Sequence, residues 1–291
     1  MSEPASVITP SSLRAWPLPG PGGSKHGRGH ALVVGGAART PGGALLAGVA
    51  VLRAGAGYLQ LAVAESVAPA LGVAVPEGGV LGLPEATGGS VRGDAAEHLE
   101  SALSTADVVL IGPGLDEPEN TAELLAGIVG QLRDDTRVVL DAYALGVLPG
   151  QAEVVESLRG RVLLTPNTEE VGRLLGRDAE AMSDDVTGAA LEIADRYGAV
   201  VCAHGNVASP DGSRWAGSTG HSGLGTSGSG DVMAGVVTGL LARGAELEQA
   251  ACWGSHLHAT AGDRLAARLG PLGFLARDLL DELPLVLTEL S

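Results

Sequence analysis

The sequence predicts an α/β fold in which a mostly parallel central sheet is covered by helices on both faces. Short, continuously apolar segments alternate with longer helical ones, a pattern typical of parallel strands buried on both sides. The composition is 45% hydrophobic but only 2% aromatic, so the predicted core is aliphatic. No long linker divides the 291 residues. We therefore expect an irregular lead-in, rich in Pro, Ser and Gly, over residues 1–29 and a single domain over residues 30–291.

Strands are predicted where short apolar runs rich in Val and Leu stand between turn-forming residues. In chain order these runs cover residues 31–36, 58–64, 107–112, 137–142, 162–166 and 199–203. The sequence Pro210-Asp211-Gly212 is a turn signal, and it predicts a hairpin-like excursion within residues 200–216.

Helices are predicted in the longer segments that carry apolar residues at helical spacing. In chain order they cover residues 43–54, 119–133, 152–158, 169–175, 186–197, 231–242 and 247–269. The first of these helices is rich in small residues, and the last two follow a glycine-rich loop. Because strands and helices alternate through most of the chain, the strands are expected to run parallel.

Charge and cysteine content exclude several classes of protein. A net charge of −16 argues against nucleic acid and anionic membranes as partners. There is neither a long apolar run nor a signal-peptide pattern, so we expect no membrane span and no secretion. Cys202 and Cys252 stand alone in their segments, which predicts no disulfide framework and a cytoplasmic location.

The glycine-rich loop is the strongest functional signal. Six glycines lie within residues 217–230, directly before Asp231 and an apolar helical run. Such a loop presents unpaired N–H groups at a helix start, where the helix dipole favours an anion such as phosphate. A carboxylate at that position is suited to act as a general base on an attacking hydroxyl. The alternative is a flexible linker that ends in an Asp helix cap.

Two further acids lie at predicted strand ends, where ligands bind in open parallel sheets. Asp141 lies at the end of the strand predicted over residues 137–142. Glu170 ends the Thr165–Glu170 segment, which begins at the end of the strand predicted over residues 162–166. Together they are weak candidates to hold a hydrated Mg²⁺ ion or a sugar hydroxyl. The alternatives are a turn or N-cap acid for Asp141 and a first-turn Glu favoured by the helix dipole for Glu170.

Three other motifs are set aside. Residues 223–228 match GxGxxG, but no apolar strand leads directly into them, so a dinucleotide fingerprint is not expected. Lys25 is the only lysine, so a Walker A motif is impossible. His256 and His258 are two residues apart on a predicted helix, a spacing that argues against a shared zinc ion.

Several motifs together resemble the ribokinase-like superfamily. They are GPGL at 112–115, LDAYAL at 140–145, TPNTEE at 165–170 and GSGD at 228–231. Further segments resemble the ADP-dependent NAD(P)H-hydrate dehydratase branch in order and over nearly the whole chain. They are KHGRGHALVVGG at 25–36, GA at 43–44, AGAG at 54–57, GSGDVMAG at 228–235, LHATAGD at 257–263 and GFLARDLLDELP at 273–284.

The resemblance implies a repair lyase that dehydrates the S-form of NADH or NADPH hydrate at the expense of ADP or ATP, with Mg²⁺ bridging the phosphates. The hydroxyl is phosphorylated and phosphate is then eliminated. By this resemblance Asp231 deprotonates the hydroxyl, and N–H groups of Gly228, Ser229 and Gly230 stabilise the transferred phosphoryl group. The remaining implied positions are Ala44, Gly114 and Asn167 for the hydrate and Gly205 with Gly230 for the nucleotide. A homo-oligomer, by analogy a tetramer, is expected.

The sequence departs from the family pattern twice. Asn167 stands where the family usually has His, which keeps hydrogen bonding but not a titrating charge. His204 replaces a lysine before Gly205, and the segment to Gly212 is about three residues short. His204 either replaces the lysine as a protonated cation or is a neutral turn residue. The alternatives to the lyase are a kinase acting on a hydroxylated heterocycle and a nucleotide-binding protein without catalysis.

Overall fold

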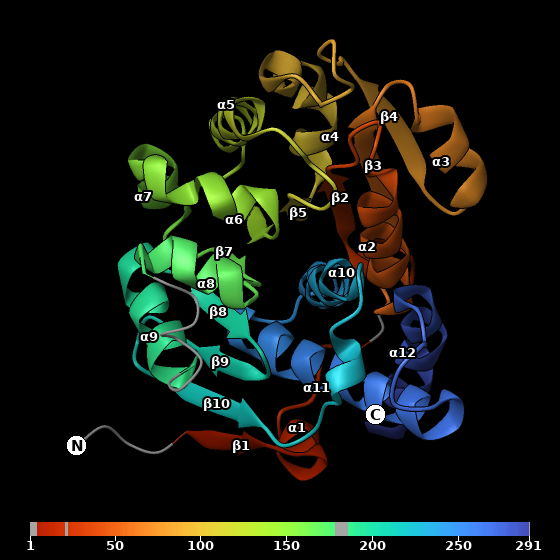
Figure 1. Ribbon diagram of the computed structural model, residues 1–291, viewed down its shortest axis with the longest axis vertical. Coiled ribbons are helices and arrows are strands. Elements are labelled where there is room, and N and C mark those ends of the chain that lie inside the picture. The colour runs from red at the N-terminus through yellow and green to blue at the C-terminus, as the bar shows by residue number, and fades with distance from the viewer. Residues whose placement is uncertain (1–4, 21–22, 178–185, 291) are drawn as a thin grey trace.

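A computed structural model describes residues 5–20, 23–177 and 186–290 and confirms the α/β class (Figure 1). The described strands form one sheet in the order β1-β10-β9-β8-β7-β6-β5-β2-β3-β4. Within it, β9 is antiparallel to β8 and β10, and the other neighbouring pairs are parallel. The strands are β1 Ser6–Ile8, β2 His30–Val34, β3 Tyr58–Ala64, β4 Gly79–Leu83, β5 Val108–Ile111, β6 Arg137–Leu140, β7 Val162–Leu164, β8 Val200–Ala203, β9 Asn206–Ala208 and β10 Arg214–Gly217.

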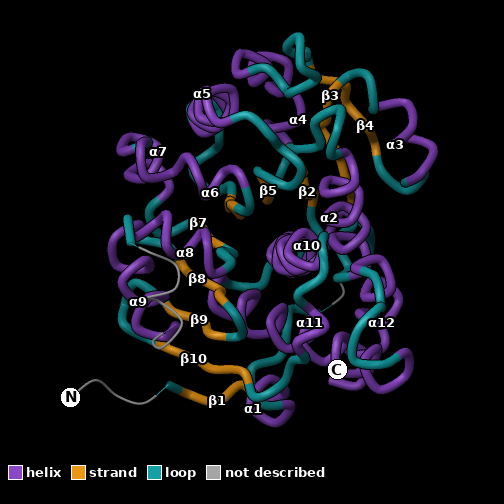
Figure 2. Tube along the Cα trace, viewed as in Figure 1, coloured by secondary structure: helices purple, strands orange, loops and turns teal. Residues whose placement is uncertain are grey.

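Helices cover both faces of this sheet (Figure 2). One aliphatic core lies beneath α2, α10, α11 and α12, and a second lies beneath α4, α5, α7, α8 and α9. Along β2 the side chains alternate between the two cores, with Val33 in the first and Leu32 and Val34 in the second. The α-helices are α1 Pro10–Ala15, α2 Pro41–Arg53, α3 Ala68–Ala74, α4 Glu100–Thr105, α5 Pro118–Val129, α6 Tyr143–Val147, α7 Ala152–Leu158, α8 Thr168–Leu175, α9 Val186–Tyr197, α10 Ser229–Ala242, α11 Leu247–Leu269 and α12 Ala276–Leu290.

The strand order reverses between β2 and β5. From β2 the chain proceeds through β3 and β4 to one edge, and from β5 it proceeds through β6 and β7 towards the other. The two strand ends meet through their glycine turns, where Gly36 N donates to Pro113 O at 2.9 Å and Ala37 N donates to Gly114 O at 2.8 Å. Open α/β sheets bind ligands in the crevice at such a switch point.

Small residues bring α10 to this crevice. A Cβ atom added at Gly235 would lie 2.2 Å from Ala47 O, and one added at Gly239 would lie 2.4 Å from Val51 O. The backbones of α10 and α2 therefore approach more closely than any larger residue would allow. As a result, α10 begins beside the ends of β2 and β5.

The predicted irregular lead-in was wrong in part. It contains β1, which pairs with β10, and the short helix α1. The Trp16 carbonyl accepts a hydrogen bond from Trp253 Nε1 at 2.9 Å, and the Trp16 ring stacks on Trp215 at 6.2 Å. Long-range contacts therefore order a segment whose own composition favours irregular structure. Residues 1–4 and 21–22 of the lead-in lie outside the described residues.

The other predicted elements are present, some with the predicted bounds and the rest with shifted ends, and several elements were not predicted. The hairpin-like excursion is confirmed as β8, β9 and β10. The unpredicted elements include the edge strand β4 with its two glycines, the short helices α3, α4 and α6, and α12, which contains Pro284. No helix in the described ranges combines the length and apolarity needed to cross a membrane.

Candidate active site

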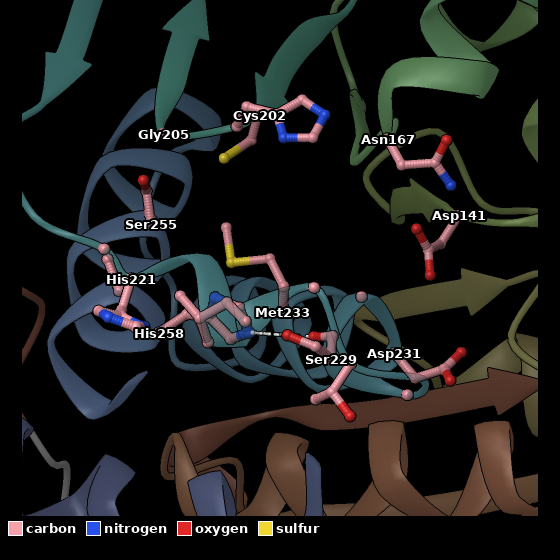
Figure 3. A pocket seen from close by; sticks show the side chains of 18 of the residues that line it. Asp141, Asn167, Cys202, Gly205, His221, Ser229, Asp231, Met233, Ser255 and His258 are labelled. Carbon is pink, nitrogen blue, oxygen red and sulfur yellow. Dashed lines mark hydrogen bonds between the residues drawn. The ribbon is translucent and has the colours of Figure 1, made fainter. Parts of the chain in front are cut away.

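A pocket of about 770 Å³ lies where the first turn of α10 faces the ends of β6 and β8 (Figure 3). This volume is typical of sites for small molecules and cofactors. Asp141, Asn167 and Asp231 lie towards one end, and Cys202, Ser255 and His221 lie towards the other (Figure 3). The lining residues are Asp141, Ala142, Asn167, Glu170, Cys202, His204, Gly205, Thr219, Gly220, His221, Ser222, Leu224, Gly225, Thr226, Gly228, Ser229, Gly230, Asp231, Met233, Ser255, His258 and Ala259.

The start of α10 is built to receive an anion. Its N-cap is Gly228, in the left-handed region at φ 88°, and no side chain caps the helix there. The N–H groups of Gly228 and Gly230 have no hydrogen-bond partner within the described ranges. The Ser229 N–H donates to Thr226 O at 3.2 Å. Two of the three N–H groups expected in the anion site are therefore free, and the helix dipole adds positive potential.

Asp231 lies on the same helical turn with a free carboxylate. Within the described ranges no group donates a hydrogen bond to its side chain. Burial raises the pKa of Asp231 to about 6. A carboxylate with a raised pKa and free lone pairs is suited to accept a proton near neutral pH.

Asp231 also lies beside the first turn of α2 and the glycine turn that follows β5. A Cβ atom added at Gly43, in the first turn of α2, would lie 3.1 Å from Asp231 Oδ1 and 2.8 Å from Gly114 N. Ala44 is fully buried, beneath Gly36. Ala44 and Gly114 do not line the pocket itself, so the carboxylate lies between the pocket and these two expected hydrate-binding positions. Contact of the two residues with a hydrate stays a prediction.

Asn167 and Glu170 form a capping box at the start of α8. Asn167 Oδ1 accepts from Glu170 N at 3.0 Å, and Glu170 Oε2 accepts from Asn167 N at 2.9 Å. Glu170 is thus a first-turn Glu, the alternative given for it above, and it also completes the cap. Because both residues also line the pocket, the cap holds an amide and a carboxylate at its rim.

Asp141 is buried at the end of β6, where Thr165 Oγ1 donates to its Oδ1 at 2.8 Å. Burial, followed by the charges of Glu170 and Asp231, raises the pKa of Asp141 to about 8. Burial also raises the pKa of Glu170. The three acids thus repel one another across the pocket, and a bound cation would relieve this repulsion.

The arrangement of these acids fits a hydrated Mg²⁺ ion. In the described part of the chain no three His, Cys, Asp or Glu side chains converge tightly enough to hold a metal directly. Mg²⁺ usually keeps several waters and binds one or two carboxylates together with substrate phosphates. Asp141 and Glu170 supply the oxygen donors that such an ion prefers. Their role as ligands through water stays a prediction.

His204 and Gly205 form the two-residue turn of the β8–β9 hairpin. Both have positive φ angles, 48° and 78°, as a tight hairpin turn requires. His204 Nε2 lies 2.8 Å from Thr168 Oγ1, and partial burial lowers the pKa of His204. This direction and the hairpin geometry agree with the turn interpretation of His204, and binding of the nucleotide by this side chain stays a prediction.

Several pocket residues were not identified from the sequence. His258 Nε2 lies 3.0 Å from both Oγ and O of Ser229, and His221 Nδ1 accepts from Gly223 N at 3.0 Å. Met233 is four residues after Ser229, and this spacing could have placed both on one face if the predicted helix had begun at Ser229. No comparable signal linked β8 and α11 to the glycine-rich loop.

The sheet topology and the position of the pocket define a ribokinase-like fold, in which a carboxylate and unpaired N–H groups lie on one helical turn. A ribokinase-like superfamily protein from Enterococcus faecalis has the same fold, with a TM-score of 0.83 at 21% identity over 99% of this chain and 96% of that one. Residues 31–285 match the family model described as NAD(P)H-hydrate dehydratase. The chain therefore belongs to the NAD(P)H-hydrate dehydratase family.

Two relatives match this chain over all or nearly all of its length. The ADP-dependent (S)-NAD(P)H-hydrate dehydratase of Xanthomonas campestris is 45% identical over 98% of this chain and 96% of its own. The ADP/ATP-dependent NAD(P)H-hydrate dehydratase of Bacillus subtilis, co-crystallised with ATP/Mg²⁺, has a TM-score of 0.83 at 26% identity, with full coverage of both chains.

Proposed function

We propose that this protein is an ADP-dependent (S)-NAD(P)H-hydrate dehydratase, a metabolite repair lyase. The observation that carries the proposal is the free carboxylate of Asp231 on the same helical turn as the unpaired N–H groups of Gly228 and Gly230. A base and an anion site so arranged can activate a hydroxyl and stabilise the phosphoryl group that it attacks. Family membership selects the hydrate as the source of that hydroxyl.

We propose that the adenine ring of the nucleotide lies against the apolar side chains that line the pocket. They are Cys202, Leu224, Met233 and Ala259. With adenine against these side chains, the phosphates extend along the first turn of α10 and the terminal phosphoryl group reaches Asp231. The hydrate then lies on the other side of the Asp231 carboxylate, towards Ala44 and Gly114.

Asp231 first accepts the proton of the hydrate hydroxyl. The hydroxyl oxygen then forms a bond to the terminal phosphorus of ADP, and the bond from that phosphorus to the bridging oxygen breaks to leave AMP. The N–H groups of Gly228 and Gly230 stabilise the transferred negative charge. In the second step the ring carbon–oxygen bond breaks and phosphate leaves with the bonding electrons. The neighbouring ring carbon gives its proton to the departing phosphate, and the electrons of that carbon–hydrogen bond restore the double bond. Mg²⁺ held through water by Asp141 and Glu170 would neutralise phosphate charge.

We propose ADP as the donor because the 45% identical relative is named ADP-dependent. Desolvation lowers the pKa of His204, which disfavours its charged form. We therefore propose that the donor phosphates are bound mainly by the α10 N–H groups and a divalent cation. The structurally similar B. subtilis protein is named ADP/ATP-dependent, so both donors belong in the test.

A coupled assay tests this function. Purified protein is mixed with hydrated NADH, Mg²⁺ and either ADP or ATP, and the recovery of reduced-nicotinamide absorbance is followed. We expect recovery only with nucleotide, and none with Asp231→Asn at equal concentration and intact fold. Absence of recovery with either donor would reject the lyase. The kinase alternative predicts instead that nucleotide is consumed with a hydroxylated heterocycle and that a stable phosphate ester accumulates.

We further propose that the protein acts as a homo-oligomer, by analogy with the family a tetramer. The small-residue faces of α2 and α10 pack against each other within the chain, so they do not supply a contact between subunits. Exposed leucines near the α11–α12 connection offer a different surface: Leu269, Leu272, Leu275 and Leu285. Light scattering of the purified protein decides the state, and a monomer at all concentrations would reject this proposal. The cytoplasmic location stays a prediction.

A further inference from the structure

His258 on α11 contacts the anion-binding turn of α10 through a single residue. Its Nε2 lies 3.0 Å from the carbonyl oxygen of Ser229 and 3.0 Å from the Ser229 hydroxyl (Figure 3). Ser229 is only 4% exposed, and its hydroxyl has no other hydrogen-bond partner in the described ranges. The contact lies at a helix start whose glycine N-cap provides no side chain of its own.

The hydrogen on this imidazole can be assigned from chemistry. A carbonyl oxygen only accepts hydrogen bonds, so His258 Nε2 must carry the hydrogen that lies between it and Ser229 O. The same N–H group then also faces Ser229 Oγ, which acts as an acceptor. Consequently the hydroxyl hydrogen of Ser229 is not used by His258 and is free to point into the pocket.

Burial lowers the pKa of His258 to about 4, so the ring is neutral under ordinary conditions. A neutral ring with the hydrogen on Nε2 keeps this arrangement across the working pH range. The backbone N–H of Ser229 is meanwhile engaged with Thr226 O at 3.2 Å. The residue therefore has one donor left for a ligand, and that donor is its hydroxyl.

We propose that His258 is a positioning residue that orients the Ser229 hydroxyl as a hydrogen-bond donor to the terminal phosphate of the nucleotide. This inference rests on the proposed function and deepens it. Ser229 contributes to the anion site through its side chain, beside the N–H groups of Gly228 and Gly230. The LHATAGD segment of α11 thereby acts on the phosphate through α10.

The test is a double-mutant cycle of wild type, His258→Ala, Ser229→Ala and the double variant, with kcat/KM and the Kd for ADP as readouts. We expect each single variant to lower kcat/KM about 10- to 100-fold, the loss that follows when a donor to developing charge is removed. In the Ser229→Ala background, His258→Ala should cost less than about threefold, because coupled residues are not additive. His258→Gln, which keeps a neutral N–H donor, should recover most of the lost activity.

His256→Gln is the matched control, because His256 is on the same helix and does not line the pocket. Equal losses from His258→Ala in both backgrounds would overturn the inference, as would Ser229→Ala with wild-type kcat/KM. If His258→Ala does not fold, the cycle is run with His258→Leu, and Ser229→Ala alone still decides the role of the hydroxyl. The Kd for ADP is measured for the same four proteins, and this measurement does not require turnover. An inactive wild type would therefore reject the lyase while the binding cycle still decides the positioning role.

Discussion

Asp231 is distinguished by what its carboxylate lacks. A capping Asp accepts hydrogen bonds from backbone N–H groups of its helix, whereas the Asp231 carboxylate has no donor in the described ranges. Without donors, burial acts alone and raises its pKa to about 6. The structure therefore favours the general base over the helix cap, the two alternatives left open by the sequence.

This pKa predicts a pH profile. The base works only when ionised, so kcat/KM for the hydrate at saturating Mg²⁺ and ADP should rise as pH increases through about 6 and level off above pH 7. Asp231→Asn should lower kcat/KM about 100- to 10,000-fold. Initial rates between pH 5 and 8 provide the measurement. A profile that stays flat over this range, or near-full turnover in Asp231→Asn, would contradict the assignment.

Ala142 stores backbone strain next to Asp141. Its φ of 50° and ψ of −122° lie in a region that residues with a Cβ atom rarely adopt. Ala142→Gly should therefore raise the free energy of unfolding by about 1 kcal/mol, since relieved strain exceeds the entropy cost of glycine. Urea denaturation measures the change. A destabilised variant would show that the Cβ atom makes packing contacts worth more than the strain.

Residues with a local chemical signature were predicted from the sequence, whereas those defined by distant contacts were not. Asp231 and its glycines are adjacent in the chain, so their joint presence in the pocket follows from one motif. His258 reaches Ser229 from a different helix, and only the packing of α11 on α10 brings them together. Lys25 is the only lysine of the chain and precedes β2. Its Nζ atom lies 4.6 Å from the centroid of the Tyr58 ring, a contact that the sequence did not predict.

At the scale of elements, the contact between α10 and α2 holds the anion site against the crevice. Gly235→Ala would place a methyl group 2.2 Å from Ala47 O, which forces the helices apart. We expect a loss of about 1–3 kcal/mol in the free energy of unfolding, as overpacking typically causes. Thermal and urea denaturation measure this loss.

Gly42→Ala is the matched control on α2, because an added Cβ atom there meets nothing within 4 Å. It should leave stability unchanged or raise it by about 0.4–1 kcal/mol through the unfolded state. If Gly235→Ala were tolerated as well as Gly42→Ala, the helices would have room to move apart, and close backbone contact would not be what positions α10.

Elements with a strong periodic signal were predicted well, and those that depend on neighbours were not. The helices at 152–158, 186–197 and 247–269 have the predicted bounds, because their apolar spacing and flanking residues are local properties. β1 is three residues long and exists through its pairing with β10. The start of α10 was placed two residues late, because Ser229 and Gly230 have poor helix propensity and tertiary contacts extend the helix to include them.

At the scale of the whole molecule, the gathering of acidic side chains at the pocket lowers the stability of the folded state. The chain carries a net charge of −16, and Asp141, Glu170 and Asp231 come from three separate elements to one pocket. In an unfolded chain these carboxyls would be far apart and hydrated. Folding brings them together in a partly buried space, which raises the pKa of each. The pocket is therefore a region where function is maintained at the expense of stability.

This arrangement predicts how stability depends on pH. The pKa of Asp141 is about 8 in the folded protein and 3.8 for the ordinary side chain, so the folded state binds more protons between these values. Stability then falls as pH rises wherever the folded state holds the extra proton. The favourable contribution of protonated Asp141 is complete below about pH 4 and is lost as pH rises through 8. The free energy of unfolding should decline over this window.

Asp141→Asn isolates this effect, because the amide keeps the shape of the side chain without its titration. Between pH 5 and 8 the free energy of unfolding should decrease in wild type by at least about 1.4 kcal/mol more than in the variant, the equivalent of one pKa unit. Glu77→Gln, which removes one exposed surface charge, is the control for the general effect of net charge. Urea denaturation at several pH values gives both slopes.

Equal slopes of stability against pH in wild type and Asp141→Asn would mean that the pocket acids rearrange on ionisation. Mg²⁺ would then have no repulsion to relieve. If the slopes differ as expected, added Mg²⁺ should flatten the wild-type curve towards that of the variant, because a bound cation compensates the same carboxylate charge.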